Sequence, residues 1–346
     1  MLDAIAAAQK RVYLSTYIIK MDTTGLAFID HLEAAARRGL DVRVLIDGVG
    51  ELYAFRRVVS HLRRRGIPSA RFLPPRLLPP SVHVNLRNHR KLLVVDNAVA
   101  FAGGMNISED NTASPGRARS ISDIHFQLRG PVVDELAAVF LDDWSFATRE
   151  PGAEEADSQT AACGDVGCRV IPDGPDRDLD ALALTIEATV SAACVSIDIM
   201  TPYFLPSRDL LASLISATLR GVRVRIVLPA ENNLWYVHWA NRNLLAELVQ
   251  WSAEVYYQPP PFCHSKLLCV DDAYTLIGSA NLDPRSLRLN FEVGIELFSG
   301  PLTQRLRGHV EQIIAVSRRA TRDELGNRSI PARLRDSAAA LLSPYL

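Results

Sequence analysis

Two histidine–lysine pairs are the residues of this chain with the clearest capacity for chemistry. His89 and Lys91 are separated by one residue, and His264 and Lys266 are separated in the same way. A histidine can attack as a nucleophile or transfer protons, and a neighbouring lysine can stabilise negative charge on a reacting group. The pairs therefore indicate catalysis on an anionic group such as a phosphodiester.

Each pair lies in an apolar, β-branched run, which predicts a buried strand whose side chains alternate between two faces. The histidine and lysine of one pair then share a face. Asp96 and Asp271 follow their histidines by an odd number of residues, so they point to the opposite face if the strand is unbroken. We expect a structural role at the strand end for both aspartates, while the alternative that each orients its own histidine stays open.

A second pattern follows both pairs at the same distance. Gly103-Gly104-Met105-Asn106 comes after the first motif, and Gly278-Ser279-Ala280-Asn281 comes after the second. Amide side chains at these positions can donate hydrogen bonds to the oxygens of a bound phosphodiester. Four residues of this pattern are therefore candidates for substrate binding or support: Gly104, Asn106, Ser279 and Asn281.

Two H-x-K-x4-D motifs, each with a G-[GS]-x-N tail, resemble the phospholipase D superfamily, and the resemblance covers the whole chain. Four further stretches are most similar to bacterial cardiolipin synthases: Thr201–Pro206, Ile277–Asp283, Leu289–Glu292 and Leu341–Leu346. The resemblance implies an α/β fold of two α/β/α sandwich domains, related by a pseudo-two-fold axis, with mixed and largely parallel sheets. It also implies that both motifs face one shared cleft.

The resemblance implies a catalytic set made of both motifs: His89, Lys91, Asp96, His264, Lys266 and Asp271. It assigns the nucleophile to His89, through a phosphohistidine, and acid–base catalysis to His264. The internal symmetry leaves the reverse assignment open. In the family an acidic residue downstream of the G-[GS]-x-N tail fixes the tautomer of each imidazole, and the matching positions here are Asp123 and Glu292.

The implied reaction passes a phosphatidyl group from phosphatidylglycerol to a second phosphatidylglycerol, which yields cardiolipin and glycerol. Two alternatives stay open. One is a phosphodiesterase, either a phospholipid hydrolase or a nuclease, in which water is the acceptor. The other is a non-catalytic membrane-binding module. The sequence has no dense carboxylate or histidine cluster, so we expect neither a metal ion nor another cofactor.

Composition limits the partners and the compartment. A formal net charge of −1 argues against a general nucleic-acid binder, and five cysteines without paired C-x2-C spacing fit a reducing compartment. No apolar run approaches the roughly 20 residues that span a bilayer. We therefore expect a cytoplasmic protein that associates peripherally with the inner face of the membrane, with an anionic phospholipid as substrate.

The beginning of the sequence differs from what the resemblance implies. Many cardiolipin synthases have hydrophobic N-terminal anchors, and the strand that precedes the first helix of the second half has no counterpart before Ala4. We expect either that the beginning is missing or that this family member has lost it.

The order of expected elements also repeats. A strand at 12–19, a helix at 28–38 capped by Gly39 and a strand at 42–46 recur after residue 167. The segment 151–167 is rich in small and acidic residues without apolar periodicity, which predicts a linker. We expect an N-terminal domain at 1–150 with the first motif and a C-terminal domain at 168–346 with the second.

Apolar residues outside these elements suggest a lipid-facing surface. Leu77 and Leu78 lie in a proline-rich segment, and Trp235 and Trp239 lie near the start of an expected helix. The loop with Leu77 and Leu78 touches a lipid interface or is a packed surface loop, and the segment with Trp235 and Trp239 contacts acyl chains or packs in the interior. We expect serine in place of all four side chains to weaken lipid binding.

Overall fold

The computed structural model describes residues 1–53, 58–75, 85–112, 120–150, 160–232 and 234–341. The chain forms two compact units. Unit 1 consists of Met1–Ala118, Asp123–Asp165 and Asn290–Glu292, and unit 2 consists of Arg119–Ser122, Val166–Leu289 and Val293–Leu346.

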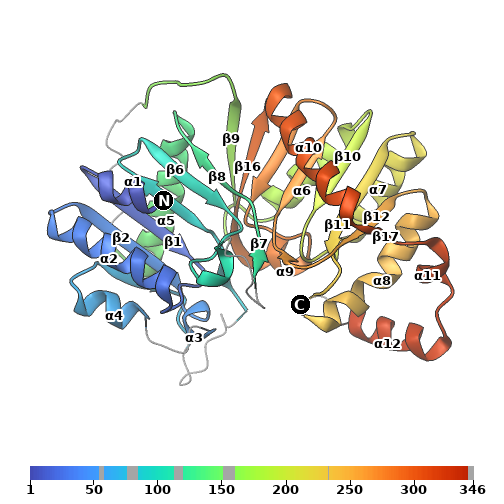
Figure 1. Cartoon of the computed structure of the whole chain (residues 1–346), viewed down its shortest axis with the longest axis horizontal. Helices are drawn as coiled ribbons and strands as arrows, with labels where there is room; N and C mark the ends of the chain where they lie inside the picture. The colour runs from blue at the N-terminus through green and yellow to red at the C-terminus, as the bar shows by residue number, and fades with distance from the viewer. Residues whose placement is uncertain (54–57, 76–84, 113–119, 151–159, 233, 342–346) are drawn as a thin grey trace. The chain divides into compact units, whose positions relative to one another are not determined.

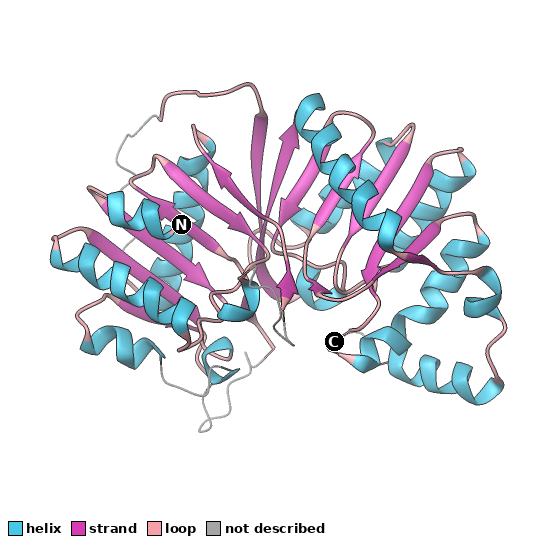
Figure 2. Cartoon of the chain, in the orientation of Figure 1, coloured by secondary structure: helices cyan, strands magenta, loops and turns pink. Residues whose placement is uncertain are grey.

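Unit 1 is a six-stranded sheet with helices on both faces. Its helices are α1 (Leu2–Ala7), α2 (Thr23–Arg37), α3 (Gly50–Tyr53), α4 (Val58–Arg64) and α5 (Val132–Thr148). Its strands are β1 (Arg11–Thr16), β2 (Asp41–Asp47), β3 (Ser69–Phe72), β5 (Leu92–Val95), β6 (Val99–Gly103) and β8 (His125–Leu128), in the order β3-β2-β1-β5-β6-β8. Figures 1 and 2 show α2 and α5 on opposite faces of this sheet.

Burial explains both faces of this sheet. Alternate residues of β1, such as Val12 and Leu14, join the apolar cluster under α1, α2 and α4. On the other face Tyr13 is 1% exposed, and its ring stacks on Phe140 of α5 with the centroids 5.0 Å apart. A strand with both faces buried has the nearly continuous apolar sequence seen here.

Unit 2 has the same architecture with additional helices. Its helices are α6 (Ala181–Ala192), α7 (Arg208–Leu219), α8 (Trp235–Gln250), α9 (Pro284–Arg288), α10 (Gly300–Val316), α11 (Arg322–Gly326) and α12 (Ile330–Ala340). Its strands are β7 (Ile121–Ser122), β9 (Gly167–Asp173), β10 (Ser196–Met200), β11 (Arg223–Pro229), β12 (Glu254–Gln258), β13 (Phe262–Cys263), β14 (Leu267–Val270), β15 (Tyr274–Gly278), β16 (Asn290–Phe298) and β17 (Arg318–Arg319).

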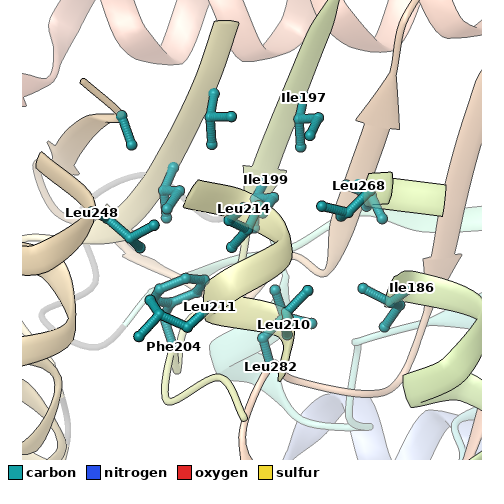
Figure 3. Packing of buried hydrophobic residues seen from close by; sticks show 14 of the residues in the cluster. Ile186, Ile197, Ile199, Phe204, Leu210, Leu211, Leu214, Leu248, Leu268 and Leu282 are labelled. Carbon is teal, nitrogen blue, oxygen red and sulfur yellow. The ribbon is translucent and has the colours of Figure 1, made fainter. Parts of the chain in front are cut away.

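The core of unit 2 lies between its sheet and the helices α6, α7 and α8. Ile197 and Ile199 of β10 point into this layer, where they meet Leu210 and Leu214 of α7 (Figure 3). Leu268 of β14 belongs to the same buried cluster. The second motif strand is therefore built into the main core of its unit.

Strand order repeats between the units. β12-β11-β10-β14-β15-β16 in unit 2 matches β3-β2-β1-β5-β6-β8 in unit 1. In each sheet the first three strands are parallel and the remaining neighbours are antiparallel. The predicted α/β fold with mixed sheets is confirmed, but within each matched set of six strands parallel pairing joins only the first three. The expectation of largely parallel sheets is corrected in this respect, because short hairpins join the strands after each motif.

Two short segments belong to the unit that does not contain their sequence neighbours. Asn290–Glu292, the start of β16, belongs to unit 1, and Arg119–Ser122, which includes β7, belongs to unit 2. The predicted boundaries, 1–150 and 168–346, do not include this exchange. The structure divides the chain between Asp165 and Val166, inside the predicted linker 151–167, of which residues 151–159 lie outside the described part.

Local sequence signals place several elements correctly. Gly39 has φ +83° directly after α2, and Gly66 has φ +75° after α4, as expected for residues that end helices. The helix predicted at 28–38 corresponds to α2, and the strand predicted at 42–46 corresponds to β2. Among the described residues, no helix is both long and apolar enough to cross a membrane.

Candidate functional site

The histidine and lysine of the first motif lie in a short break between two strands. β4 (Arg87–Asn88) ends immediately before His89, and β5 begins at Leu92, directly after Lys91. β4 pairs in parallel with the start of β16, and the backbone N–H of His89 donates to the carbonyl of Phe291 at 2.9 Å. The expectation of one unbroken strand through the motif is therefore wrong, because the backbone changes its pairing partner at the histidine.

His89 is held by a buried carboxylate. Its Nδ1 lies 2.9 Å from Oε1 and 3.2 Å from Oε2 of Glu292, whose side chain is fully buried. The Nδ2 group of Asn290 donates to Oε1 of the same carboxylate at 3.0 Å. A carboxylate on Nδ1 favours the tautomer with the proton on that atom, which leaves the lone pair on Nε2. This is the state that a nucleophilic histidine needs.

Lys91 and the aromatic ring of Tyr17 complete this part of the site. Lys91 is 2% exposed, and its Nζ donates to the carbonyl of His89 at 2.6 Å. The same ammonium lies 5.6 Å from the centroid of the Tyr17 ring, and that ring packs edge-on against His89 at 5.1 Å. One tyrosine therefore contacts both functional groups of the motif, and the cation–π contact favours the charged form of the lysine.

A buried polar network supports the backbone of the first motif. Asp47, at the end of β2, accepts hydrogen bonds from the N–H groups of Val49, Gly50 and Asn88. Burial raises the pKa of Asp47 to about 6, against the opposing effect of these amide donors. The side chain of Asn88 donates to Asp143 at 2.8 Å.

Arg90 extends this network on the other side of the histidine. It forms a buried ion pair with Asp143 and donates through Nε to the carbonyl of Glu292 at 2.8 Å. Both sequence neighbours of His89 are therefore held by buried partners. Such support limits the rotation of a functional side chain, because its own backbone cannot shift.

The second motif has the same local form. β13 ends at Cys263 and β14 begins at Leu267, so His264 again lies in an interruption. β13 pairs with β7, and the N–H of His264 donates to the carbonyl of Ser122 at 2.7 Å. Lys266 differs from the first lysine, because its Nζ lies 2.9 Å from Nδ1 and 3.0 Å from Nε2 of His264.

The G-[GS]-x-N tails lie close to Asp123 in unit 1 and to the strand of Glu292 in unit 2. A Cβ atom at Gly104 would lie 2.6 Å from Oδ2 and 2.7 Å from Oδ1 of Asp123, so only glycine leaves room for this carboxylate. Ser279, at the equivalent position, accepts a hydrogen bond from the N–H of Val293 at 3.1 Å. The tail of unit 2 therefore holds strand β16, which carries Glu292, whereas the tail of unit 1 packs against Asp123 between β7 and β8.

The strand register makes Asp123 and Glu292 equivalent. Gly103 pairs with His125 in unit 1, and Gly278 pairs with Gly294 in unit 2. Each acidic residue thus lies two positions before the partner of the first tail glycine. This internal comparison supports the family-based choice of Asp123, although its spacing from the motif differs from that of Glu292.

The two asparagines of the tails occupy equivalent positions, three residues after the first glycine of each tail. Asn281 is 5% exposed and donates through Nδ2 to Ser286 at 3.2 Å. Its buried Oδ1 and that of Asn106 have no hydrogen-bond partner among the residues that the structure describes. His125, beside Asp123, has a pKa lowered by burial to about 4, which keeps its imidazole neutral.

The motif aspartates bind backbone amides at the start of a neighbouring strand. The carboxylate of Asp96 accepts from the N–H groups of residues 9, 10 and 11 at 2.7, 2.7 and 2.8 Å. Asp271 accepts from those of residues 194, 195 and 196. Both have positive φ, at +55° and +50°. These hydrogen bonds hold each carboxylate at the end of its strand, and the structural role that we expect for both aspartates stays a prediction.

Sequence reasoning did not single out several residues of this site. Tyr17, Asn88, Arg90 and Asn290 contact the motif side chains or their backbone, yet each is a common residue type in an unremarkable local pattern. Asn290 had one usable signal, since it directly precedes the conspicuous Phe291-Glu292 pair. Within the parts of the chain that the structure describes, no group of three or more His, Cys, Asp or Glu side chains has the arrangement of a metal site.

Of the four side chains considered for lipid contact, that of Trp239 lies in the described part of the chain. Trp239 packs in a small apolar cluster with Val237 and Ala240, and the guanidinium of Arg335 lies 4.2 Å from the centroid of its ring. Trp239 is only partly buried, so its expected contact with acyl chains stays a prediction. Leu77, Leu78 and the side chain of Trp235 lie outside the described residues.

Comparison with known proteins identifies the family. The family model for "Cardiolipin synthase, PLD-like domain" matches residues 1–144 and 186–314. The cardiolipin synthase of Oceanobacillus iheyensis is 31% identical over 347 residues, which cover 100% of this chain and 72% of that protein. The major cardiolipin synthase ClsA of Bacillus subtilis is 32% identical over 349 residues, with the same coverage.

Solved structures agree on the fold. The phosphatidylserine synthase of Haemophilus influenzae has a TM-score of 0.76 at 18% identity and covers 100% of this chain and 92% of its own. The polyphosphate kinase of Porphyromonas gingivalis has a TM-score of 0.60 at 15% identity and covers 90% of this chain and 44% of its own. The matched family model, the relatives that align with the whole of this chain and the repeated motifs show one thing together. This chain belongs to the cardiolipin synthase family of the phospholipase D superfamily.

Proposed function

We propose that this protein is a phosphatidyltransferase that forms cardiolipin and glycerol from two molecules of phosphatidylglycerol. The observation that carries the proposal is the contact between Nδ1 of His89 and the buried carboxylate of Glu292. In a family of phosphatidyltransferases, this contact prepares one histidine for attack on phosphorus.

The proposed reaction is a double displacement. Nε2 of His89 attacks the phosphorus of the first phosphatidylglycerol, and the bond to the glycerol oxygen breaks while His264 protonates that oxygen. A phosphohistidine and free glycerol result. His264 then takes the proton of a hydroxyl on the second phosphatidylglycerol, whose oxygen attacks the phosphorus and releases His89.

Fixed charges support this sequence of steps. Lys91 and Lys266 are 2% and 7% exposed, so their ammonium groups lie in surroundings where they stabilise phosphate oxygens more than they would in water. The contact of Lys266 with the ring of His264 ties the second lysine to the proposed acid–base residue. Asn106 and Asn281 complete the proposed set of phosphate contacts.

Asp123 is the proposed partner of the His264 imidazole. The proposal rests on its register equivalence to Glu292, which holds the other motif histidine. We further propose that the protein acts at the inner, cytoplasmic face of the membrane as a peripheral protein, because both substrates are anionic lipids. Water as the acceptor would instead produce phosphatidic acid.

The test begins with the products. Incubation with phosphatidylglycerol vesicles should yield cardiolipin and glycerol, measured by mass spectrometry. His89→Ala should abolish an acid-labile phosphoenzyme, whereas His264→Ala should still form it from a substrate whose leaving group needs no protonation. His309→Ala, on α10, is the matched control and should keep the activity of the parent.

Each contrary result has a distinct meaning. Phosphatidic acid as the main product would replace the transferase with a hydrolase. Trapping lost only in the His264 variant would reverse the two histidine roles. Lipid binding without any turnover would leave a membrane-binding module.

A further inference from the structure

Three of the most exposed large apolar side chains of the described residues lie on one helix. Leu341 is 79% exposed, Ile330 is 73% exposed and Leu334 is 66% exposed. All three belong to α12 or to its last turn, since Leu341 keeps right-handed helical angles at φ −65° and ψ −23°. Their spacings of four and seven residues put them on one face of the helix.

The opposite face of α12 is anchored to its own unit. Asp336 is fully buried and forms ion pairs with Arg328 and Arg335. Ala339 is 8% exposed and packs with Val237 and Ala240 of α8. Figure 1 shows α12 beside α8. Because the anchored residues lie across the helix from the leucines and isoleucine, the apolar face points away from α8.

Two arginines flank the apolar face. Arg333 and Arg335 lie on its two sides by helical spacing, and both are exposed residues of α12. The guanidinium of Arg335 is kept in place by Asp336 and by the ring of Trp239. An apolar stripe between basic side chains is the pattern of a helix that lies in the interface of an anionic bilayer.

We propose that α12 docks this protein on an anionic phospholipid surface, with Ile330, Leu334 and Leu341 inserted among the acyl chains. Charge complementarity selects this occupant, since the arginines beside the stripe would meet lipid phosphates at the depth of the headgroups. The inference rests on the proposed function, because it places the enzyme on the membrane that contains its substrate. A second copy of the chain, which would bring the same arginines together, is the competing occupant.

The direct test is a vesicle-binding assay. The parent and the triple variant Ile330→Ser, Leu334→Ser, Leu341→Ser are sedimented with vesicles of phosphatidylglycerol and phosphatidylcholine. The triple variant should show at least a tenfold lower partition coefficient. Because the substituted side chains are exposed, its thermal unfolding midpoint should match that of the parent.

The matched control replaces equally exposed residues elsewhere in unit 2. Leu184, Leu219 and Val316 are 61%, 66% and 65% exposed, and their triple serine variant should bind as the parent does. Arg333→Glu should weaken binding about fivefold on phosphatidylglycerol vesicles and leave binding to pure phosphatidylcholine unchanged, because it acts only through charge.

The outcomes separate this proposal from the proposed function. Equal binding by parent and α12 triple variant, or an equal loss in the control triple variant, overturns the docking role of α12. A parent dimer that the α12 variant converts to monomers without loss of vesicle binding assigns the stripe to a second copy and also overturns it. Binding is measured with the inactive His89→Ala protein as well, so failure of phosphatidyl transfer leaves the docking result intact.

Discussion

At the scale of single residues, the site depends on how one imidazole is held. The Nδ1 atom of His89 contacts Glu292, and Tyr17 packs against the edge of the ring. In the second half of the chain, strand register makes Pro202 the equivalent of Tyr17. A tyrosine at this position is therefore specific to the first motif, the one with the proposed nucleophile, whereas His264 has the ring of Phe262 at 6.0 Å.

Glu292→Gln should reduce kcat by about 10- to 100-fold while the protein stays folded, because a neutral amide holds the imidazole and its Nδ1 proton less firmly. Turnover of phosphatidylglycerol and the thermal unfolding midpoint are measured together. Glu296→Gln is the matched control, since Glu296 is a buried carboxylate of the same strand that pairs with Arg169. Equal losses of kcat in both variants would remove the special role of Glu292.

Tyr17→Leu should lower kcat by about 3- to 30-fold, the equivalent of a cation–π contact of about 0.5–2 kcal/mol. Tyr17→Phe keeps the ring and should restore activity to within about twofold of the parent. The pH profile of kcat/KM should shift for Leu alone, because only that variant removes the ring from Lys91 and His89.

The control for this substitution is Tyr256→Leu, which removes a ring beneath Arg319 at 5.9 Å, outside both motifs. It should leave kcat unchanged. A loss in Tyr17→Phe as large as in Tyr17→Leu would assign the effect to the hydroxyl group and not to the ring.

At the scale of elements, the histidine and lysine of each motif lie between two strands, and the motif aspartate follows the last residue of the second strand. Asp96 follows β5 and binds amides at the start of β1, and Asp271 follows β14 and binds amides at the start of β10. Although burial opposes the change, these amides hold the pKa of Asp271 below its usual range. A carboxylate with a lowered pKa stabilises the fold above its ordinary pKa, and that stability is lost as the pH falls.

Asp96→Asn and Asp271→Asn should each reduce the free energy of unfolding by about 1–2 kcal/mol, because an amide cannot accept as many backbone hydrogen bonds. The stability of Asp271→Asn should also fall less steeply in acid. Chemical unfolding at neutral and acidic pH measures both effects, and turnover per folded molecule should stay close to that of the parent.

Asp30→Asn is the control, since Asp30 is 62% exposed and forms only a surface ion pair with Arg65. Its unfolding free energy should change by less than about 0.5 kcal/mol. A loss of turnover without a loss of stability in the motif variants would restore the catalytic role implied by the family resemblance.

At the scale of the whole molecule, the exchange of short segments joins the two halves of the sequence. Phe291 lies in the second half but packs in unit 1, where its ring contacts Phe72 at 4.8 Å and Phe146 at 6.0 Å. Glu292 reaches His89 through the same exchange. The histidine of the first motif thus depends on a strand that the second half provides.

Phe291→Ala should destabilise the protein by about 3–5 kcal/mol, because it removes a ring that is 5% exposed from a packed aromatic cluster. Hydrogen exchange should show the larger loss of protection in β1 and β2 of unit 1 than in β10 and β11 of unit 2. Phe298→Ala, on the same strand but 49% exposed, is the control and should cost about 1 kcal/mol or less. Greater loss in unit 2 would contradict the assignment of Phe291 to unit 1.

The sequence by itself determined what is repeated. The two H-x-K-x4-D motifs, their tails, the alternation of strands and helices and the glycines after α2 and α4 are local patterns, and local backbone preference with hydrophobic periodicity decides them. The parity argument for the aspartates does not hold as a local pattern, because the strand between each histidine and its aspartate is interrupted.

Only the tertiary structure decided which residues meet. The pairing of β4 with β16 brings Glu292 to His89, and the end of β1 brings Tyr17 to the same imidazole. Such contacts join residues that are 203 and 72 positions apart, and no local pattern specifies them. They follow from strand pairing and from the burial of charge, which are properties of the folded chain as a whole.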